Sequence, residues 1–120
     1  MSDEDFGSNK RILVVDDSIV MRTQFRTELA AAGHEVDEAQ DGASALRLLE
    51  EHVYDVALVD LNMPGMNGLQ LVQELRKSSR HDDLFILMVS TETGADTVLQ
   101  GRSLGVKGWV PKPVPMAQIM

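Results

Sequence analysis

Hydrophobic residues fall into short continuous runs, separated by longer segments in which they recur at helical spacing. Three runs are continuous, at residues 12–15, 56–59 and 84–89. Runs of this length are typical of strands buried on both faces, as in a parallel sheet, because neither face needs polar residues. Weaker strands are expected at residues 34–39 and 106–110. The pattern therefore predicts five strands.

The segments between these runs have the spacing of amphipathic helices. One helix is predicted from apolar residues at intervals of four, four and three: Met21, Phe25, Leu29 and Ala32. Gly33 follows as its expected C-cap. Three further helices are predicted from Ala45, Leu48 and Leu49, from Leu69, Val72 and Leu75, and from Val98, Leu99 and Leu104. Arg76 follows the third of these four helices, where the helix dipole favours a cation.

The alternation of strands and helices predicts an α/β fold, a parallel sheet with helices on both faces. The 120 residues, 43% hydrophobic and 25% charged, fit one globular domain, assigned to residues 10–120. Residues 1–9 are polar and acidic and are expected to form a flexible tail. Residues 113–120 leave room for only about one and a half turns of a fifth helix. That helix is expected to be short or truncated, leaving one sheet face partly uncovered.

Composition excludes several classes of function. The chain has no cysteine, which excludes a disulfide framework, a thiolate metal site and a cysteine nucleophile. The longest apolar run, residues 84–89, is far shorter than the roughly 20 residues of a membrane helix. The net charge of −8, without a basic cluster, argues against direct binding to nucleic acid. The N-terminus carries no basic-then-apolar leader, so we expect a cytoplasmic protein without membrane insertion.

Polar residues follow the predicted strands at their carboxyl ends. Asp16 and Asp17 follow the first strand, Asp60 the third, Ser90 the fourth and Lys112 the fifth. Sites of open parallel sheets form at this edge, so neighbouring first and third strands would bring three carboxylates together. Two such charges ~4 Å apart repel by about 4 kcal/mol at an effective dielectric of 20. A hard divalent cation such as Mg²⁺ is the expected compensation, and Lys112 is suited to a phosphoryl group.

Each of these residues also has an ordinary structural interpretation when it is taken alone. Asp17 with Ser18 can cap a helix, and Asp60 is an ordinary loop carboxylate. Ser90 can cap a helix or form a turn, and Lys112 can be a surface lysine. Their placement at the same end of several strands favours one shared site.

Four stretches of the chain resemble a known family: residues 12–18, 59–68, 88–91 and 105–113. They resemble the receiver domains of bacterial two-component response regulators, most closely the single-domain chemotaxis type. The resemblance extends over about residues 9–115, nearly all of the expected domain. It implies a flavodoxin-like sheet with the strand order 2-1-3-4-5.

The resemblance also implies a role for each residue at the sheet edge. Asp60 would be the phosphoacceptor, and Lys112 would contact the phosphoryl oxygens. Mg²⁺, with Mn²⁺ as an alternative, would be held by Asp17, Asp60 and the backbone carbonyl of Asn62. Asp16 would contribute to the metal site through a water molecule.

Other residues would control the lifetime and the output of the phosphorylated state. Asn62 and Glu92 stand where chemotaxis-type receivers carry residues that influence dephosphorylation, although both can be ordinary solvated loop residues. Ser90 and the aromatic Trp109 would form the conformational switch. Trp109 replaces the smaller aromatic residue usual in the family, so a static half-exposed ring is the alternative.

The resemblance implies a signalling domain that catalyses only its own phosphorylation and dephosphorylation. The donor would be a histidine kinase or a phosphotransfer domain, and the output a protein target such as the flagellar motor switch. A phosphate sink and the input module of a longer regulator remain alternatives. A phosphoaspartyl phosphatase is a further one, but that class expects Asp-x-Asp-x-Thr where this chain has Asp16, Asp17 and Ser18.

Overall fold

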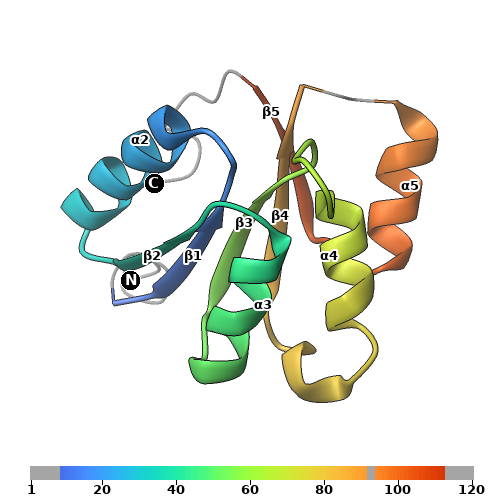
Figure 1. Cartoon of the computed structure of the whole chain (residues 1–120), viewed down its shortest axis with the longest axis horizontal. Helices are drawn as coiled ribbons and strands as arrows, with labels where there is room; N and C mark the ends of the chain where they lie inside the picture. The colour runs from blue at the N-terminus through green and yellow to red at the C-terminus, as the bar shows by residue number, and fades with distance from the viewer. Residues whose placement is uncertain (1–8, 92–93, 113–120) are drawn as a thin grey trace, which may run out of the picture.

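The strands form one parallel sheet in the computed structural model, which describes residues 9–91 and 94–112 (Figure 1). Within these residues the sheet has five strands in the order β2-β1-β3-β4-β5. In chain order they are β1 Arg11–Val15, β2 Glu35–Ala39, β3 Val56–Asp60, β4 Phe85–Ser90 and β5 Gly108–Pro111. The predicted α/β fold and its strand order are therefore confirmed.

The helices cover the two faces of the sheet unequally (Figure 1). Helix α2 (Ile19–Ala31) lies on one side, and α3 (Gly42–Glu51), α4 (Gly68–Leu75) and α5 (Ala95–Ser103) lie on the other. A short 3-10 helix, η1 (Ser79–His81), precedes β4 and was not predicted. In the described ranges no helix has the length and apolar character needed to cross a membrane.

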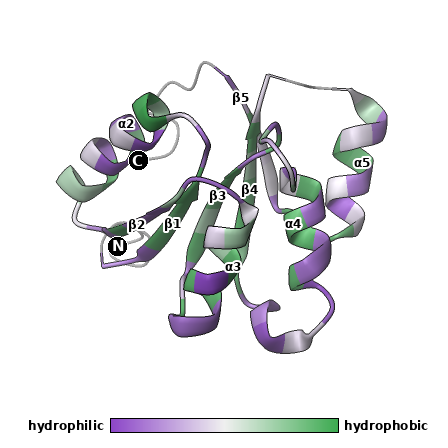
Figure 2. Cartoon of the chain, viewed as in Figure 1, coloured by the Kyte–Doolittle hydropathy of each residue, from purple (hydrophilic) through white to green (hydrophobic). Residues whose placement is uncertain are grey.

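Alternate residues of each central strand belong to two separate hydrophobic cores. Leu13 and Val15 of β1 face the larger core, which α3 and α4 complete. Ile12 and Val14 face the smaller core, where Phe25 is among the α2 residues buried against the sheet. Figure 2 shows the central strands as largely hydrophobic, whereas the helices alternate between hydrophobic and hydrophilic residues. Burial on both faces explains why β1 and β3 read as continuous apolar runs.

Side-chain caps begin three of the helices. Ser18 accepts from the backbone N–H of Met21 at 3.3 Å and begins α2. Asp41 accepts from Ser44 N at 2.8 Å and begins α3. Asn67 forms a reciprocal capping box with a glutamine side chain at the start of α4. These caps satisfy N–H groups that would otherwise lack partners.

One local prediction was wrong, and one residue makes contacts that were not predicted. The fifth strand begins at Gly108 rather than at residue 106, because Val106 N donates to Gly101 O at 3.0 Å in the turn that follows α5. Arg76 lies at the C-cap of α4, as predicted, and its guanidinium also donates to the carbonyls of Leu104 at 2.6 Å and His81 at 3.0 Å. Arg76 therefore joins α4 to two neighbouring loops.

The smaller core is only partly covered by the described residues. Phe85 of β4 is 45% exposed, and Val56, Leu87 and Val110 are half-buried. Residues 113–120, where a short fifth helix was expected, lie outside the described part of the chain, as do residues 1–8 of the expected tail. The predicted boundary between tail and domain therefore stays a prediction.

Candidate metal centre at the carboxyl edge of the sheet

Three carboxylates meet where β1 and β3 end. Asp16 directly follows β1, Asp60 is the last residue of β3, and the two strands are neighbours paired at Val15 and Val59. Together with Asp17 they place one carboxylate oxygen each within 4.8 Å of one another. The predicted convergence of the three carboxylates is therefore present in the structure.

The three carboxylates differ in their access to water. Asp16 is 2% exposed and Asp60 is 3% exposed, whereas Asp17 lies on the surface. Buried charges require partners, because the protein interior solvates them poorly. The site therefore has two enclosed acidic groups and an open side next to Asp17.

Lys112 supplies a cation to the two buried carboxylates. Its ammonium nitrogen lies 3.2 Å from Asp16 Oδ2 and 3.3 Å from Asp60 Oδ1. Its backbone N–H donates to the carbonyl of Ser90 at 3.0 Å, which fixes the residue after β5 beside the end of β4. The alternative of an ordinary surface lysine is wrong, because the side chain is only 20% exposed and contacts both carboxylates.

The electrostatics of the site shift the pKa values of Asp60 and Lys112. Burial, followed by the nearby charge of Asp16, raises the pKa of Asp60, and the Lys112 ammonium opposes this shift. Burial alone would lower the pKa of Lys112, but the attraction of Asp16 and Asp60 outweighs burial and raises it. Lys112 therefore stays protonated at neutral pH, as expected of a cation held between two carboxylates.

Backbone N–H groups orient the two buried carboxylates. Ser18 N donates to Asp16 Oδ1 at 2.9 Å, and Asn62 N donates to Asp60 Oδ1 at 3.3 Å. The predicted cap of the first helix is thus provided by the Ser18 hydroxyl, while Asp17 takes part in the carboxylate cluster. The loops after β1 and β3 therefore hold the acidic groups in place.

The donor set fits a hard divalent cation. One ammonium group faces three carboxylates, so the cluster retains excess negative charge. All of the available ligand atoms are oxygens, which Mg²⁺ and Mn²⁺ prefer. Because Asp17 is exposed, the cluster is in contact with solvent on that side.

Comparison with known proteins decides the family. Residues 12–120 match the family described as response regulator receiver domain.

The chain belongs to the response regulator receiver family.

Two similar proteins come from chemotaxis. A chemotaxis protein CheY homolog of Campylobacter jejuni is 40% identical over 105 residues, covering 86% of this chain and 81% of the relative. The structure of the chemotaxis response regulator CheY4 of Vibrio cholerae has a TM-score of 0.88 and 36% identity, covering 93% of each chain. The predicted resemblance to the chemotaxis type is therefore confirmed.

The structure of a third similar protein was solved as a complex with ligands. The response regulator TrrA of Thermotoga maritima, in complex with Mg²⁺ and BeF, has a TM-score of 0.80 and 31% identity. The match covers 92% of this receiver and 92% of that chain.

The receiver places both predicted switch residues near the larger core. Ser90 is fully buried at the end of β4. Trp109 of β5 pairs with Met88 and is partly buried. Because Met88 and Ser90 are two residues apart in one strand, Ser90 and Trp109 face the same side of the sheet. A Cβ atom at Gly101 of α5 would lie 2.8 Å from the Trp109 ring, so the indole packs directly against that helix.

The residues predicted to tune dephosphorylation are only partly described. Asn62 is exposed and lies two residues after Asp60. Glu92 lies outside the described residues, so its predicted role stays a prediction.

Arg22 also belongs to this region, although no sequence pattern predicted it there. Its guanidinium Nη1 donates to the backbone carbonyl of Asp16 at 2.8 Å. The residue stands in the first turns of α2, where an arginine ordinarily faces solvent, so its spacing carried no signal. Only the packing of α2 beside β2 brings its side chain to the loop after β1.

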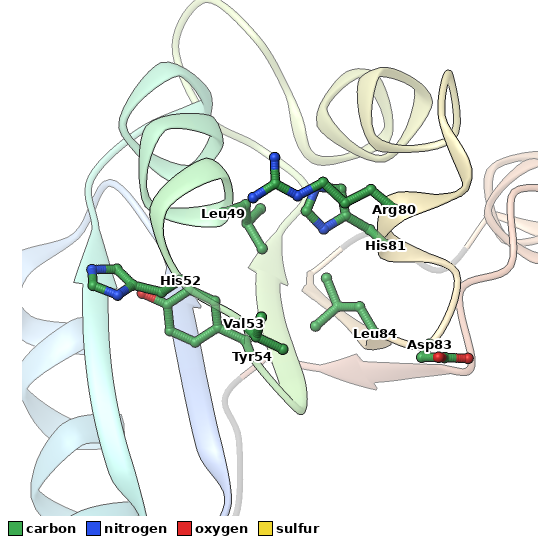
Figure 3. Close-up of a pocket in the computed structure, with 8 residues that line it drawn as sticks. All are labelled: Leu49, His52, Val53, Tyr54, Arg80, His81, Asp83 and Leu84. Carbon is green, nitrogen blue, oxygen red and sulfur yellow. The ribbon is translucent and has the colours of Figure 1, made fainter.

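A separate cavity of about 140 Å³ lies at the opposite end of β3 and β4 (Figure 3). Leu49 and Leu84 line it together with Arg80, His81 and Tyr54, and Figure 3 shows Arg80 and His81 on the opposite side of the view from Tyr54. Tyr54 precedes β3 and Leu84 precedes β4, so this cavity is remote from the carboxylates.

Proposed function

We propose that the chain is a cytoplasmic phosphoacceptor, with a receiver domain at residues 10–120, that takes a phosphoryl group onto Asp60. The donor is a phosphohistidine of a histidine kinase or of a phosphotransfer domain. The observation that carries this proposal is the buried Asp60 carboxylate, set between two further carboxylates and the Lys112 ammonium.

The residues around Asp60 are suited to holding Mg²⁺, with Mn²⁺ as an alternative. Asp17, Asp60 and the backbone carbonyl of Asn62 would bind the ion, and Asp16 would contribute through water. When bound, the ion supplies positive charge that offsets the repulsion between the carboxylate and the phosphoryl oxygens. The Mg²⁺ and BeF complex of the similar Thermotoga maritima regulator supports this assignment.

The transfer itself requires positioning more than covalent chemistry. A carboxylate oxygen of Asp60 attacks phosphorus in line with the phosphorus–nitrogen bond of the donor. A phosphorus–oxygen bond forms, the phosphorus–nitrogen bond breaks, and the imidazole leaves with its electron pair. Lys112 holds the phosphoryl oxygens by charge, and Asp16 and Asp17 perform no proton transfer. The product is a mixed anhydride that water hydrolyses, so the domain catalyses only its own phosphorylation and dephosphorylation.

The output is a shift in population between two conformations. The phosphoryl group favours the state in which the Ser90 hydroxyl moves toward it and the Trp109 ring changes its rotamer. The target is a protein, and the flagellar motor switch is the leading candidate, because the similar proteins from Campylobacter jejuni and Vibrio cholerae are named as chemotaxis proteins.

Incubation with Mg²⁺ and acetyl phosphate, followed by intact mass measurement, tests this proposal. The parent protein should gain the mass of one phosphoryl group, and Asp60→Asn should gain none. The emission of Trp109, the only tryptophan, should change in the same sample. Equal phosphorylation of both proteins would contradict the assignment of Asp60. Constant emission at full phosphorylation would remove Trp109 from the switch.

A further inference from the structure

The backbone of Asp16 is held by neighbouring elements at both its N–H and its carbonyl group, and the carbonyl is part of the peptide that joins Asp16 to Asp17. Asp16 N donates to the carbonyl of Ala39, at the end of the edge strand β2, at 3.1 Å. The carbonyl of Asp16 accepts from Arg22 Nη1 at 2.8 Å. These two contacts fix the chain at the point where it leaves the sheet, and they set the orientation of the following residue.

Arg22 is itself held in place by Glu38. Its Nε donates to Glu38 Oε1 at 3.2 Å, so one guanidinium contacts a carboxylate through one nitrogen and a carbonyl through another. The Arg22 side chain is 13% exposed and that of Glu38 is 23% exposed. This enclosed, forked geometry is specific to arginine, because a lysine ammonium lacks the planar arrangement of donors. The contact is therefore directional as well as electrostatic.

The position of the Asp17 carboxylate depends on this backbone more than the positions of the Asp16 and Asp60 carboxylates do. Asp16 and Asp60 each accept a backbone N–H and contact Lys112, whereas the exposed Asp17 side chain has no recorded hydrogen bond or ion pair within residues 9–91 and 94–112. The direction of its carboxylate is thus set mainly by the peptide that precedes it. Loosening that peptide would remove Asp17 from the cluster without altering any carboxylate.

We propose that Arg22, held by Glu38, is a positioning residue that orients the Asp16–Asp17 peptide and so sets the affinity of the site for a divalent cation. This inference rests on the proposed metal-dependent function. It opposes the simple electrostatic expectation, in which the loss of a nearby positive charge would strengthen cation binding. Removal of Arg22 is instead expected to weaken binding. Groups that orient a metal ligand typically contribute about 10- to 100-fold to metal affinity.

Arg26 offers a matched control. It lies one turn further along α2 and pairs with the same carboxylate, with Nη1 2.8 Å from Glu38 Oε2, but its guanidinium is not recorded in contact with Asp16. Arg26→Met therefore removes the same charge and a salt bridge to the same glutamate. It leaves the contact between Arg22 and Asp16 in place.

Mn²⁺ affinity, measured by calorimetry on fully folded protein, tests the inference. Arg22→Met and Arg22→Lys should each bind Mn²⁺ about 10-fold more weakly or worse. Glu38→Gln should weaken binding in the same direction, and Arg26→Met should match the parent. Circular dichroism at the same temperature establishes that each variant is folded. A variant that is not folded there is measured at a lower temperature.

The possible failures are distinguishable. If the parent binds Mn²⁺ and Arg22→Met binds equally or more tightly, the positioning role is wrong and the proposed function stands. If Arg22→Lys binds Mn²⁺ as tightly as the parent, a positive charge at position 22 is enough for full affinity. That result would also overturn the inference, because a lysine cannot make the forked contact with Glu38 and Asp16. If the parent binds no Mn²⁺, the metal-dependent function itself fails.

Discussion

Lys112 contacts Asp16 across 96 residues of chain, with 3.2 Å between the ammonium nitrogen and Asp16 Oδ2. The contact brings the residue after the edge strand β5 to the end of β1, over the intervening ends of β3 and β4. The same ammonium lies 3.3 Å from Asp60. Lys112 therefore offsets the charge of both buried carboxylates, and in the proposed function it would also contact the phosphoryl group.

Lys112→Met should separate metal binding from phosphoryl transfer. Without its ammonium, the oxygens of Asp16 and Asp60 are more available to a cation, so Mn²⁺ affinity should rise roughly fivefold, equivalent to about 1 kcal/mol of relieved repulsion. The rate of phosphorylation by acetyl phosphate should fall about 100-fold, as for loss of one preorganised donor to a charged transition state. Calorimetry and intact mass measurement report the two quantities.

Lys107→Met is the control for Lys112. It removes the same charge from an exposed residue near the start of β5, where only the backbone N–H of Lys107 contacts β4. The Mn²⁺ affinity and the rate of phosphorylation should both remain at the parent level in Lys107→Met. Rapid phosphorylation of Lys112→Met would contradict the role assigned to the Lys112 ammonium.

Asn62→Lys should lengthen the life of the phosphorylated state. The Asn62 side chain is exposed two residues after Asp60, so in the proposed function it would stand near the mixed anhydride. A longer, charged side chain there should obstruct that water, while the Asn62 backbone N–H still donates to Asp60. Loss of phosphate from radiolabelled protein measures the lifetime. Gln73→Lys, an exposed change of the same kind in α4, should leave it unaltered, and an unchanged rate in Asn62→Lys would exclude Asn62 from this role.

Sequence patterns predicted those features that depend on strands and their ends. β1 and β3 were recognisable because both faces are buried, and Asp16 and Asp60 met as expected because their strands are parallel neighbours. The strand order itself came from family resemblance, since spacing alone does not determine which strands are adjacent. Parallel topology also explains why Lys112 could be placed at the same edge.

Contacts made by long side chains could not be predicted in this way. Arg22 donates to the carbonyl of Asp16, 6 residues before it, and Arg76 donates to that of Leu104, 28 residues after it; each contact exists only after a helix has packed. Helical spacing places such a residue on a face but does not give its partner. The start of β5 was also misjudged, because the apolar Val106 belongs to a turn rather than to the ladder.

Gly68→Ala should destabilise the fold beneath Asp60. A Cβ atom at Gly68 would lie 2.6 Å from the carbonyl oxygen of Asp60 and 2.8 Å from Met88 Sδ. Because the first contact is with backbone, α4 must move, and such overpacking lowers the free energy of unfolding by about 1–3 kcal/mol. Urea unfolding measures the change. Since alanine is favoured over glycine in helices by about 1 kcal/mol, unchanged or higher stability would indicate that α4 does not approach Asp60 this closely.

Stability should fall in mild acid partly because of His81. Burial, followed by the charges of Arg80 and Arg76, lowers the pKa of His81 below 6.5 in the folded chain. As pH falls through 6.5, the unfolded chain takes up this proton first, so the free energy of unfolding decreases. Above that pH the histidine is neutral in both states and contributes nothing to the slope.

The difference between parent and His81→Gln isolates this contribution from that of the carboxylates. Urea unfolding at several pH values between about 5 and 8 should give a shallower acid slope for His81→Gln, because the titrating imidazole is absent. Parallel stability curves for the two proteins across this range would contradict the lowered pKa.

The position of the phosphoryl group tests the central claim most directly. Borohydride reduces an aspartyl phosphate to homoserine, so reduction after treatment with Mg²⁺ and acetyl phosphate marks the acceptor, which peptide mass spectrometry then locates. Homoserine is expected at position 60, and none at Asp16 or Asp17. Homoserine at another position, or none in protein that has gained the mass of a phosphoryl group, would contradict that claim.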